Sequence, residues 1–295
     1  MLDGIININK EKGYTSHDAV ARLRGILKQK KIGHTGTLDP DAAGVLPVCL
    51  GKATRLCDLL TDKEKTYRAV LLLGKVTDTQ DISGQVLEEN PVSADPKEVR
   101  ACIQDFEGDS MQIPPMYSAL KVKGKRLYEL AREGVEVERE PRPIHIRQIT
   151  VQDVSLPRVA FEVTCGKGTY IRTLCHDIGQ KLGCGGCMEE LTRTRSGMFG
   201  IDQALTLAQV EKLRDEGRLC ECLVSVEQAL EKYPRILCDP NEDRLLNNGN
   251  PLSLKGCGLD GEEGWVRVCD SRGIFKGIYQ KRPGGEKYFP VKMFL

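Results

Sequence analysis

The segment from Gly33 to Pro47, with the sequence GHTGTLDPDAAGVLP, has the most unusual composition in the chain. It places three glycines, two prolines and Asp39 between an expected helix and an expected strand. An aspartate before a proline often caps a turn, and an isolated Asp-Pro pair would be interpreted in that way. A long ordered loop is more often functional. A carboxylate held in such a loop can act as a nucleophile that forms a covalent intermediate.

Several common catalytic classes are excluded by motifs that the chain lacks. Two segments, Gly51 to Thr54 and Gly166 to Thr169, resemble the end of a phosphate-binding loop. Leu46 and Phe161 stand where that motif requires its first glycine, so neither segment qualifies. The sequence also contains no H-E-x-x-H zinc motif, no G-x-S-x-G serine motif and no kinase motif set. The sequence therefore does not predict an ATP-driven enzyme or a member of the common hydrolase classes.

The chain contains 12 cysteines, a high number that raises the question of disulfides or metal. Cys184 and Cys187 form the one C-x-x-C pair, and no second pair lies at zinc-ribbon spacing. Without an export signal, in a chain long enough to build its own core, reduced thiols are the better interpretation. We expect no metal site, although a metal or redox pair stays open as the alternative.

Charge is distributed unevenly along a chain whose formal net charge is only +1. Acidic residues concentrate between 211 and 243. Taken alone, a basic run is more often a solvated face than an RNA contact. The two basic groups are Lys121, Lys123, Lys125, Arg126 and Arg132, and near the C-terminus Lys276, Lys281, Arg282, Lys287 and Lys292.

Nothing in the sequence predicts a membrane protein or a secreted one. The longest apolar run, from Ala69 to Leu73, is far too short to span a bilayer. The residues from Met1 to Ile5 lack the basic and then apolar pattern of a secretory signal. We therefore expect a cytoplasmic protein.

The elements that must position Asp39 follow from hydrophobic periodicity. Residues 4–10 alternate as in a half-buried strand, and Ser16 is the expected N-cap of a helix whose apolar face includes Val20 and Leu23. The other expected strands are 45–50, 67–73, 144–154, 159–164 and 190–198, and the other expected helices are 53–60, about 95–106, about 126–133 and 170–182. Strands and helices in this order predict an α+β domain.

Two regions depart from that pattern. Residues 113–143 combine prolines, the first basic group and a charged helix, and form an excursion from the sheet. From Pro234 onward the chain has short strands at Trp265 to Val268 and Ile274 to Tyr279, separated by turn residues. We therefore predict a domain over 1–235 and a small all-β module over 236–295.

Several blocks resemble, in order, the tRNA pseudouridine synthase B family. The loop GHTGTLDP followed by Ala-x-Gly-x-Leu-Pro is similar to the family's signature loop, in which the aspartate is the nucleophile. Such agreement across nearly the whole chain is highly specific. The other matching blocks are Lys10 with Gly13, Lys65 to Ala69, Gly74 to Asp81, Pro114 to Lys121 with Gly124-Lys125, Gly168 to Arg172 and Leu191 to Gly197.

The resemblance implies that a uridine is isomerised to pseudouridine. The N1–C1′ bond breaks and C5 joins C1′, which needs no redox cofactor, ATP or metal. Asp39 would be the nucleophile, and whether it attacks the sugar or the pyrimidine ring stays open. Arg172 would be the guanidinium that keeps Asp39 ionised and oriented. Without the resemblance, Arg172 would be an ordinary surface arginine at a helix start.

The resemblance also implies a pocket for a base extruded from a folded RNA loop. Tyr67 would stack on the uracil, although a strand tyrosine is otherwise more often a core residue. Tyr170 and Leu191 would line the pocket, and Lys10 belongs to the same implied site. His34 would enter the space that the uridine leaves, whereas the ordinary interpretation is a loop imidazole bonded to backbone.

The implied fold is a mixed, largely antiparallel sheet with flanking helices, followed by a PUA-like RNA-binding module at 236–295. The implied substrate is the T-loop uridine at position 55 of tRNA, gripped by the excursion at 113–143, with no obligatory protein partner. One alternative is a related synthase guided by a separate RNA within a ribonucleoprotein. The excursion at 113–143 argues against this alternative. Another is a non-catalytic tRNA-binding or tRNA-folding protein, against which intact Asp39, Tyr67 and Arg172 argue.

Overall fold

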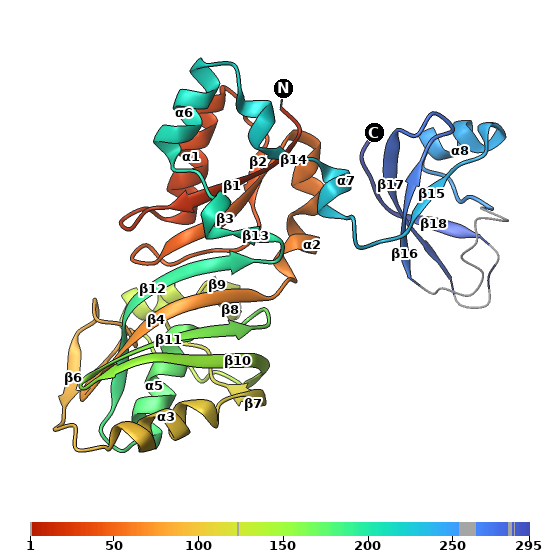
Figure 1. Cartoon of the computed structure of the whole chain (residues 1–295). Helices are drawn as coiled ribbons and strands as arrows, with labels where there is room; N and C mark the ends of the chain where they lie inside the picture. The colour runs from red at the N-terminus through yellow and green to blue at the C-terminus, as the bar shows by residue number, and fades with distance from the viewer. Residues whose placement is uncertain (1, 123, 254–263, 283–284, 286) are drawn as a thin grey trace.

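The computed structural model describes residues 2–122, 124–253, 264–282, 285 and 287–295. Figure 1 shows a large α+β part built on one long sheet and a small β module that contains the C-terminus. The predicted fold class is therefore confirmed. In the described part of the chain, no helix is both long and apolar enough to cross a membrane.

The central sheet is mixed and largely antiparallel, as predicted. β3 and β12 pair in parallel over Ala43–Gly44 and Thr192–Arg193, whereas the other strand pairings described in this sheet are antiparallel. Its main path is β14 (Leu223–Val224), β1 (Gly4–Lys10), β3 (Ala43–Leu50), β12 (Gly186–Ser196), β4 (Lys65–Leu73), β11 (Arg158–Cys165), β10 (Arg142–Ser155) and β7 (Gly108–Gln112), with β2 (Ile32–His34) on β3 and β13 (Phe199–Gly200) on β12.

Helices cover the sheet in two groups, one on each half (Figure 1). α1 (Ser16–Leu27) and α6 (Leu207–Asp215) pack with β1 and β3 around Ile6, Leu23 and Leu46. α3 (Pro96–Gln104) and α5 (Ile171–Lys181) pack on β4, β10, β11 and β12 around a second cluster that includes Phe161 and Leu174. The shorter helices are η1 (Gly51–Leu56), α2 (Cys57–Thr61), α4 (Leu127–Arg132), η2 (Ile201–Gln203), η3 (Leu219–Cys222), α7 (Val226–Ala229), η4 (Pro240–Glu242) and α8 (Asp243–Asn247).

The predicted N-cap of α1 is wrong by one residue. Thr15 is the cap, because its backbone is extended and its hydroxyl accepts the N–H of Asp18 at 3.0 Å. Ser16 is instead fully buried, and its hydroxyl accepts the N–H of Leu38 at 2.9 Å. The predicted helix at 53–60 is also divided, into the 3-10 turn η1 and the short helix α2.

The excursion at 113–143 forms a small hairpin and helix outside the main sheet. Its strands are β8 (Lys121–Val122) and β9 (Lys125–Arg126), and α4 follows with Leu127 buried. Of the predicted basic group, Lys125 forms an exposed ion pair with Glu133, and Lys123 lies outside the described residues. A second hairpin, β5 (Lys75–Thr77) and β6 (Val86–Glu89), follows β4.

The C-terminal module is a four-stranded sheet with its own core. Its order is β15 (Arg235–Leu237), β16 (Trp265–Cys269), β17 (Phe275–Lys281) and β18 (Tyr288–Met293), around buried residues that include Val268 and Tyr279. The module is not independent of the rest. Ile278 and Phe294 share an apolar cluster with Leu56 and Leu60 of the large part.

Polar contacts reinforce this junction. The ammonium of Lys292 lies 3.1 Å from a carboxylate oxygen of Asp58 and donates to the carbonyl of Arg55 at 2.8 Å. Arg55 in turn donates to the carbonyl of Met293. The last strand therefore fastens the module to η1 and α2.

We predict that Phe294→Ala lowers the free energy of unfolding by about 3 kcal/mol, because it empties a buried site that joins the two parts. Leu295→Ala is the matched control, since Leu295 is 44% exposed. Urea unfolding of the two variants checks this. Equal stabilities would show that the module is not anchored through Phe294.

Candidate active site

Asp39 lies on the loop between β2 and β3, beside the parallel seam where β3 meets β12. Its carboxylate faces the guanidinium of Arg172, the second residue of α5. The Nε of Arg172 lies 2.9 Å from Oδ2 of Asp39, and its Nη2 donates to Oδ1 at 3.3 Å. This two-pronged contact fixes the direction of the carboxylate.

Arg172 is itself held in place by backbone oxygens. It is 5% exposed, and it donates to the carbonyls of Thr79 at 3.2 Å and of Tyr117 at 2.9 Å. A second carboxylate, Asp81, lies 3.7 Å from its Nη1. The guanidinium therefore connects the loop between β2 and β3, named the catalytic loop after the role proposed below for Asp39, to the β5–β6 turn and to the start of the excursion.

Two opposing effects act on the pKa of Asp39. Burial of the loop raises this pKa above its ordinary value, and the guanidinium of Arg172 opposes the rise. The nearby Asp81 adds to the rise, whereas Lys10 opposes it. The ionised form that a nucleophile requires thus depends on the guanidinium.

The predicted pocket residues Tyr67 and Leu191 lie on the neighbouring strands β4 and β12, in one apolar cluster with Leu38 of the catalytic loop. Burial raises the pKa of Tyr67, so its hydroxyl stays protonated at neutral pH. Tyr170 stands just before α5, two residues from Arg172, and its backbone is fixed by paired hydrogen bonds to the side chain of Gln112.

His34 ends β2, five residues before Asp39. Its Nδ1 accepts the N–H of Gly36 at 3.3 Å, and its ring meets His17 edge-on with centroids 5.4 Å apart. Burial lowers the pKa of His34, and His17 lowers it further. The imidazole is therefore neutral near pH 7, with Nδ1 as the acceptor.

Lys10, the last residue of β1, is 1% exposed, and its side chain contacts the backbone of the catalytic loop. Its ammonium donates to the carbonyls of Tyr14 at 2.6 Å, Glu11 at 3.0 Å and Pro40 at 3.1 Å. Burial lowers its pKa to about 8. Lys10 thus contacts the backbone next to Asp39, and three carbonyls occupy its donors.

Family models match most of the chain. The description "TruB family pseudouridylate synthase (N terminal domain)" matches residues 24–171, and "tRNA pseudouridylate synthase B C-terminal domain" matches residues 172–231. The chain belongs to the TruB family of pseudouridylate synthases. The family expected from the sequence is therefore confirmed, and Asp39 and Arg172 belong to a pseudouridine synthase.

Individual relatives extend this result. The chain is 47% identical to the tRNA pseudouridine synthase B of Lachnoclostridium phytofermentans, with all of both chains covered. It is 50% identical to that of Clostridium tetani, over 84% of this chain and 85% of the relative. Among solved structures, a Cbf5-Nop10-Gar1 complex and an H/ACA RNP bound to a substrate RNA match 99% of this chain and 85% of theirs, with TM-scores of 0.77 and 0.75 at 28% and 26% identity.

Arg193 on β12 is a residue of this TruB-family site whose role the sequence did not reveal. It is 1% exposed, and its Nε donates to the carbonyl of Val45 at 2.6 Å. Its two terminal nitrogens donate to the carbonyls of Gly36 at 3.2 Å and Thr37 at 3.5 Å. Its position within Leu191 to Gly197 gave the family resemblance, but burial of its guanidinium under the catalytic loop follows only from the fold. Asp81 and Ser16 were missed in the same way.

Among the described residues, no group of three or more His, Cys, Asp or Glu side chains is placed to hold a metal ion. The described cysteines therefore take part in no such site. Cys184 and Cys187 are buried free thiols near the start of β12. Burial raises the pKa of Cys187 to about 11, so it is a poor thiolate at neutral pH.

We predict that Arg172→Gln moves the acid limb of the pH–rate profile to higher pH, because the uncompensated burial raises the pKa of Asp39 further. Arg172→Lys retains the charge but loses the planar fork. This variant should keep the acid limb near its wild-type position while turnover falls about 100-fold through misplacement of the carboxylate.

The measurement is pseudouridine formation at saturating RNA from pH 5 to 9, with RNA affinity and circular dichroism as controls for folding. Wild-type turnover in Arg172→Lys would contradict the role of the fork. An unmoved acid limb in Arg172→Gln would contradict the electrostatic role.

Proposed function

We propose that this protein converts the uridine at position 55, in the T loop of tRNA, to pseudouridine, with Asp39 as the nucleophile. One observation carries this proposal, namely the carboxylate of Asp39 held by the two-pronged contact of buried Arg172. The family and its relatives named tRNA pseudouridine synthase B support the reaction and the tRNA substrate.

The reaction sets what the site must do. Uridine and pseudouridine are isomers, so the atoms balance without a cofactor, ATP or metal. The N1–C1′ bond breaks, the base turns, C5 bonds to C1′, and the C5 proton leaves to water while N1 gains a proton. Asp39 forms the covalent intermediate, at C1′ of the sugar or at C6 of the ring, and is released when the product forms.

A base within a folded loop must leave its stack to reach Asp39. Tyr67 and Leu191 supply the apolar wall beside Leu38, against which the flipped uracil packs. Tyr170 closes the pocket next to Arg172. His34, neutral and at the entrance of the same loop, takes the space that the uridine leaves in the RNA.

Sequence identity favours a tRNA enzyme over a subunit of a ribonucleoprotein. The chain is 47–50% identical to proteins named tRNA pseudouridine synthase B but 26–28% identical to the proteins of the H/ACA and Cbf5 structures. The excursion at 113–143 grips the tRNA T-arm directly, so no protein partner is required. A purely binding function is disfavoured by the Asp39–Arg172 pair, which simple RNA binding does not need.

We further propose that residues 1–235 form the catalytic domain, that 236–295 is a PUA-like RNA-binding module and that the enzyme works in the cytoplasm. Two of the five basic residues expected to bind RNA form ion pairs within the protein, and a third, Arg282, stacks on the ring of Phe289 at 3.8 Å. Lys276 lies 3.3 Å from buried Asp270, and Lys292 contacts Asp58. Phosphate contacts of the module therefore fall to Lys281, Arg282 and Lys287.

The test is release of tritium from tRNA transcript labelled at uridine C5, which reports the new C5–C1′ bond. Asp39→Asn keeps size and polarity but removes the nucleophile, so release should vanish while tRNA affinity stays within a few-fold, because phosphate contacts dominate affinity. Asp41→Asn, a neighbouring exposed aspartate, is the matched control and should retain activity. Tritium release by Asp39→Asn would refute the assignment of the nucleophile.

A further inference from the structure

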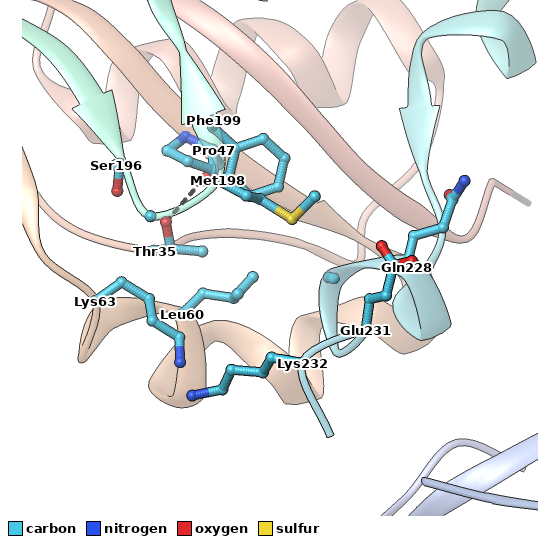
Figure 2. Close-up of a pocket in the computed structure, with 12 residues that line it drawn as sticks. Thr35, Pro47, Leu60, Lys63, Ser196, Met198, Phe199, Gln228, Glu231 and Lys232 are labelled. Carbon is cyan, nitrogen blue, oxygen red and sulfur yellow. Dashed lines mark hydrogen bonds between the residues drawn. The ribbon is translucent and has the colours of Figure 1, made fainter. Parts of the chain in front are cut away.

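A cavity lies next to the catalytic loop, and Asp39 is not among the residues that line it. It has a volume of about 340 Å³. Figure 2 shows that its walls come from the catalytic loop, from α2, from the β12–β13 turn and from the segment at α7. Leu60, Met198 and Phe199 make its apolar side, and Thr35 stands four residues before Asp39 in the same loop.

Two lysines meet at this cavity from distant parts of the chain. Lys63 lies in the turn between α2 and β4, and Lys232 follows α7. Figure 2 shows their ammonium ends pointing toward each other, and the two groups interact directly. Two like charges facing each other are unfavourable unless an anion lies between them.

The acidic neighbours of Lys63 in the chain are directed elsewhere. Asp62 lies 2.9 Å from the ammonium of Lys167, and Glu64 lies 3.0 Å from the guanidinium of Arg147. Glu231 lines the cavity beside Gln228, away from the paired ammonium groups (Figure 2). Burial lowers the pKa of Lys63 to about 8, contact with Lys232 lowers it further, and the charge of Asp62 opposes this shift. The same contact raises the pKa of Lys232. The lysine pair thus presents positive charge at the cavity, carried first by Lys232, whose ammonium also lies 4.6 Å from the ring centroid of Tyr233.

We propose that Lys63 and Lys232 bind one backbone phosphate of the RNA substrate. This inference rests on the proposed function, since the ligand is the RNA whose uridine reaches Asp39. A phosphodiester fits the site because its charge neutralises the lysines while its sugar packs against Leu60 and Phe199. A free inorganic anion would use the lysines but would leave the apolar wall unpaired. Apolar walls also reduce screening, which strengthens the attraction.

Protection of the lysines from acetylation tests occupancy directly. The wild-type protein is treated with an amine-acetylating reagent at pH 8, alone, with tRNA transcript or with inorganic phosphate, and each lysine is measured by mass spectrometry. Lys63 and Lys232 should be protected by the transcript and much less by phosphate at millimolar concentration. Lys97, exposed on α3, is the control and should react equally in all three samples.

Charge variants test the energetic consequence. Lys63→Gln with Lys232→Gln should weaken tRNA affinity several-fold and reduce the slope of log K against log salt by about 0.9, as expected for one lost phosphate contact. Turnover at saturating tRNA should not change, because neither lysine touches the reacting base. Lys63→Arg with Lys232→Arg should restore both affinity and slope, and Lys97→Gln should alter neither.

Three outcomes would overturn the proposal. Unprotected lysines would exclude occupancy, equal protection by phosphate and transcript would show a free-anion site, and an unchanged salt slope in the double glutamine variant would exclude a phosphate contact. Tritium release by the wild-type protein, measured on the same preparation, reports the proposed function separately. Loss of protection with normal release would therefore refute this site alone.

Discussion

The ion pair between Asp39 and Arg172 is the interaction on which the rest of the site depends. Burial opposes the ionised carboxylate, and the guanidinium beside it favours that form. The guanidinium is buried as well, so it requires the carbonyls of Thr79 and Tyr117 as further partners. The pair can form only when the loop, the β5–β6 turn, the excursion and α5 are all in place. The ionisation and orientation of the Asp39 carboxylate therefore depend on the complete fold.

The catalytic loop lies beside a short strand pairing of the central sheet, and several separate side chains support it. β3 and β12 pair over two residues, so this ladder contributes few hydrogen bonds beside the loop that precedes β3. Gly44 permits this close approach, because a Cβ there would lie 2.2 Å from the carbonyl oxygen of Arg193 and its φ is +106°. Arg193 then binds the loop from β12, and Lys10 binds it from β1.

Periodicity and family resemblance predicted the sheet, the helices and the residues that surround Asp39, because strand alternation and short motifs are local properties of the chain. The supports of the loop were not predictable in that way. Ser16 has the residue type of a helix cap, and only the tertiary position of Leu38 makes it a buried acceptor one residue inside the helix. Arg193 was visible as part of a motif, but a charged residue in a strand normally indicates a solvated face. Its three carbonyl partners lie about 150 residues earlier in the sequence.

Counting charges along the chain does not predict the RNA-binding surface, for a related reason. Lys276 and Lys292 belong to the basic C-terminal group by sequence, yet one neutralises buried Asp270 and the other fastens the module to α2. Lys63 and Lys232 belong to no basic run, yet the fold places them together beside the catalytic loop. A protein with a net charge of +1 can still bind a polyanion when its carboxylates are paired within the fold and a few cations are left facing each other. What decides the RNA-binding surface is which positive charges are left without a carboxylate partner, and that is determined by packing.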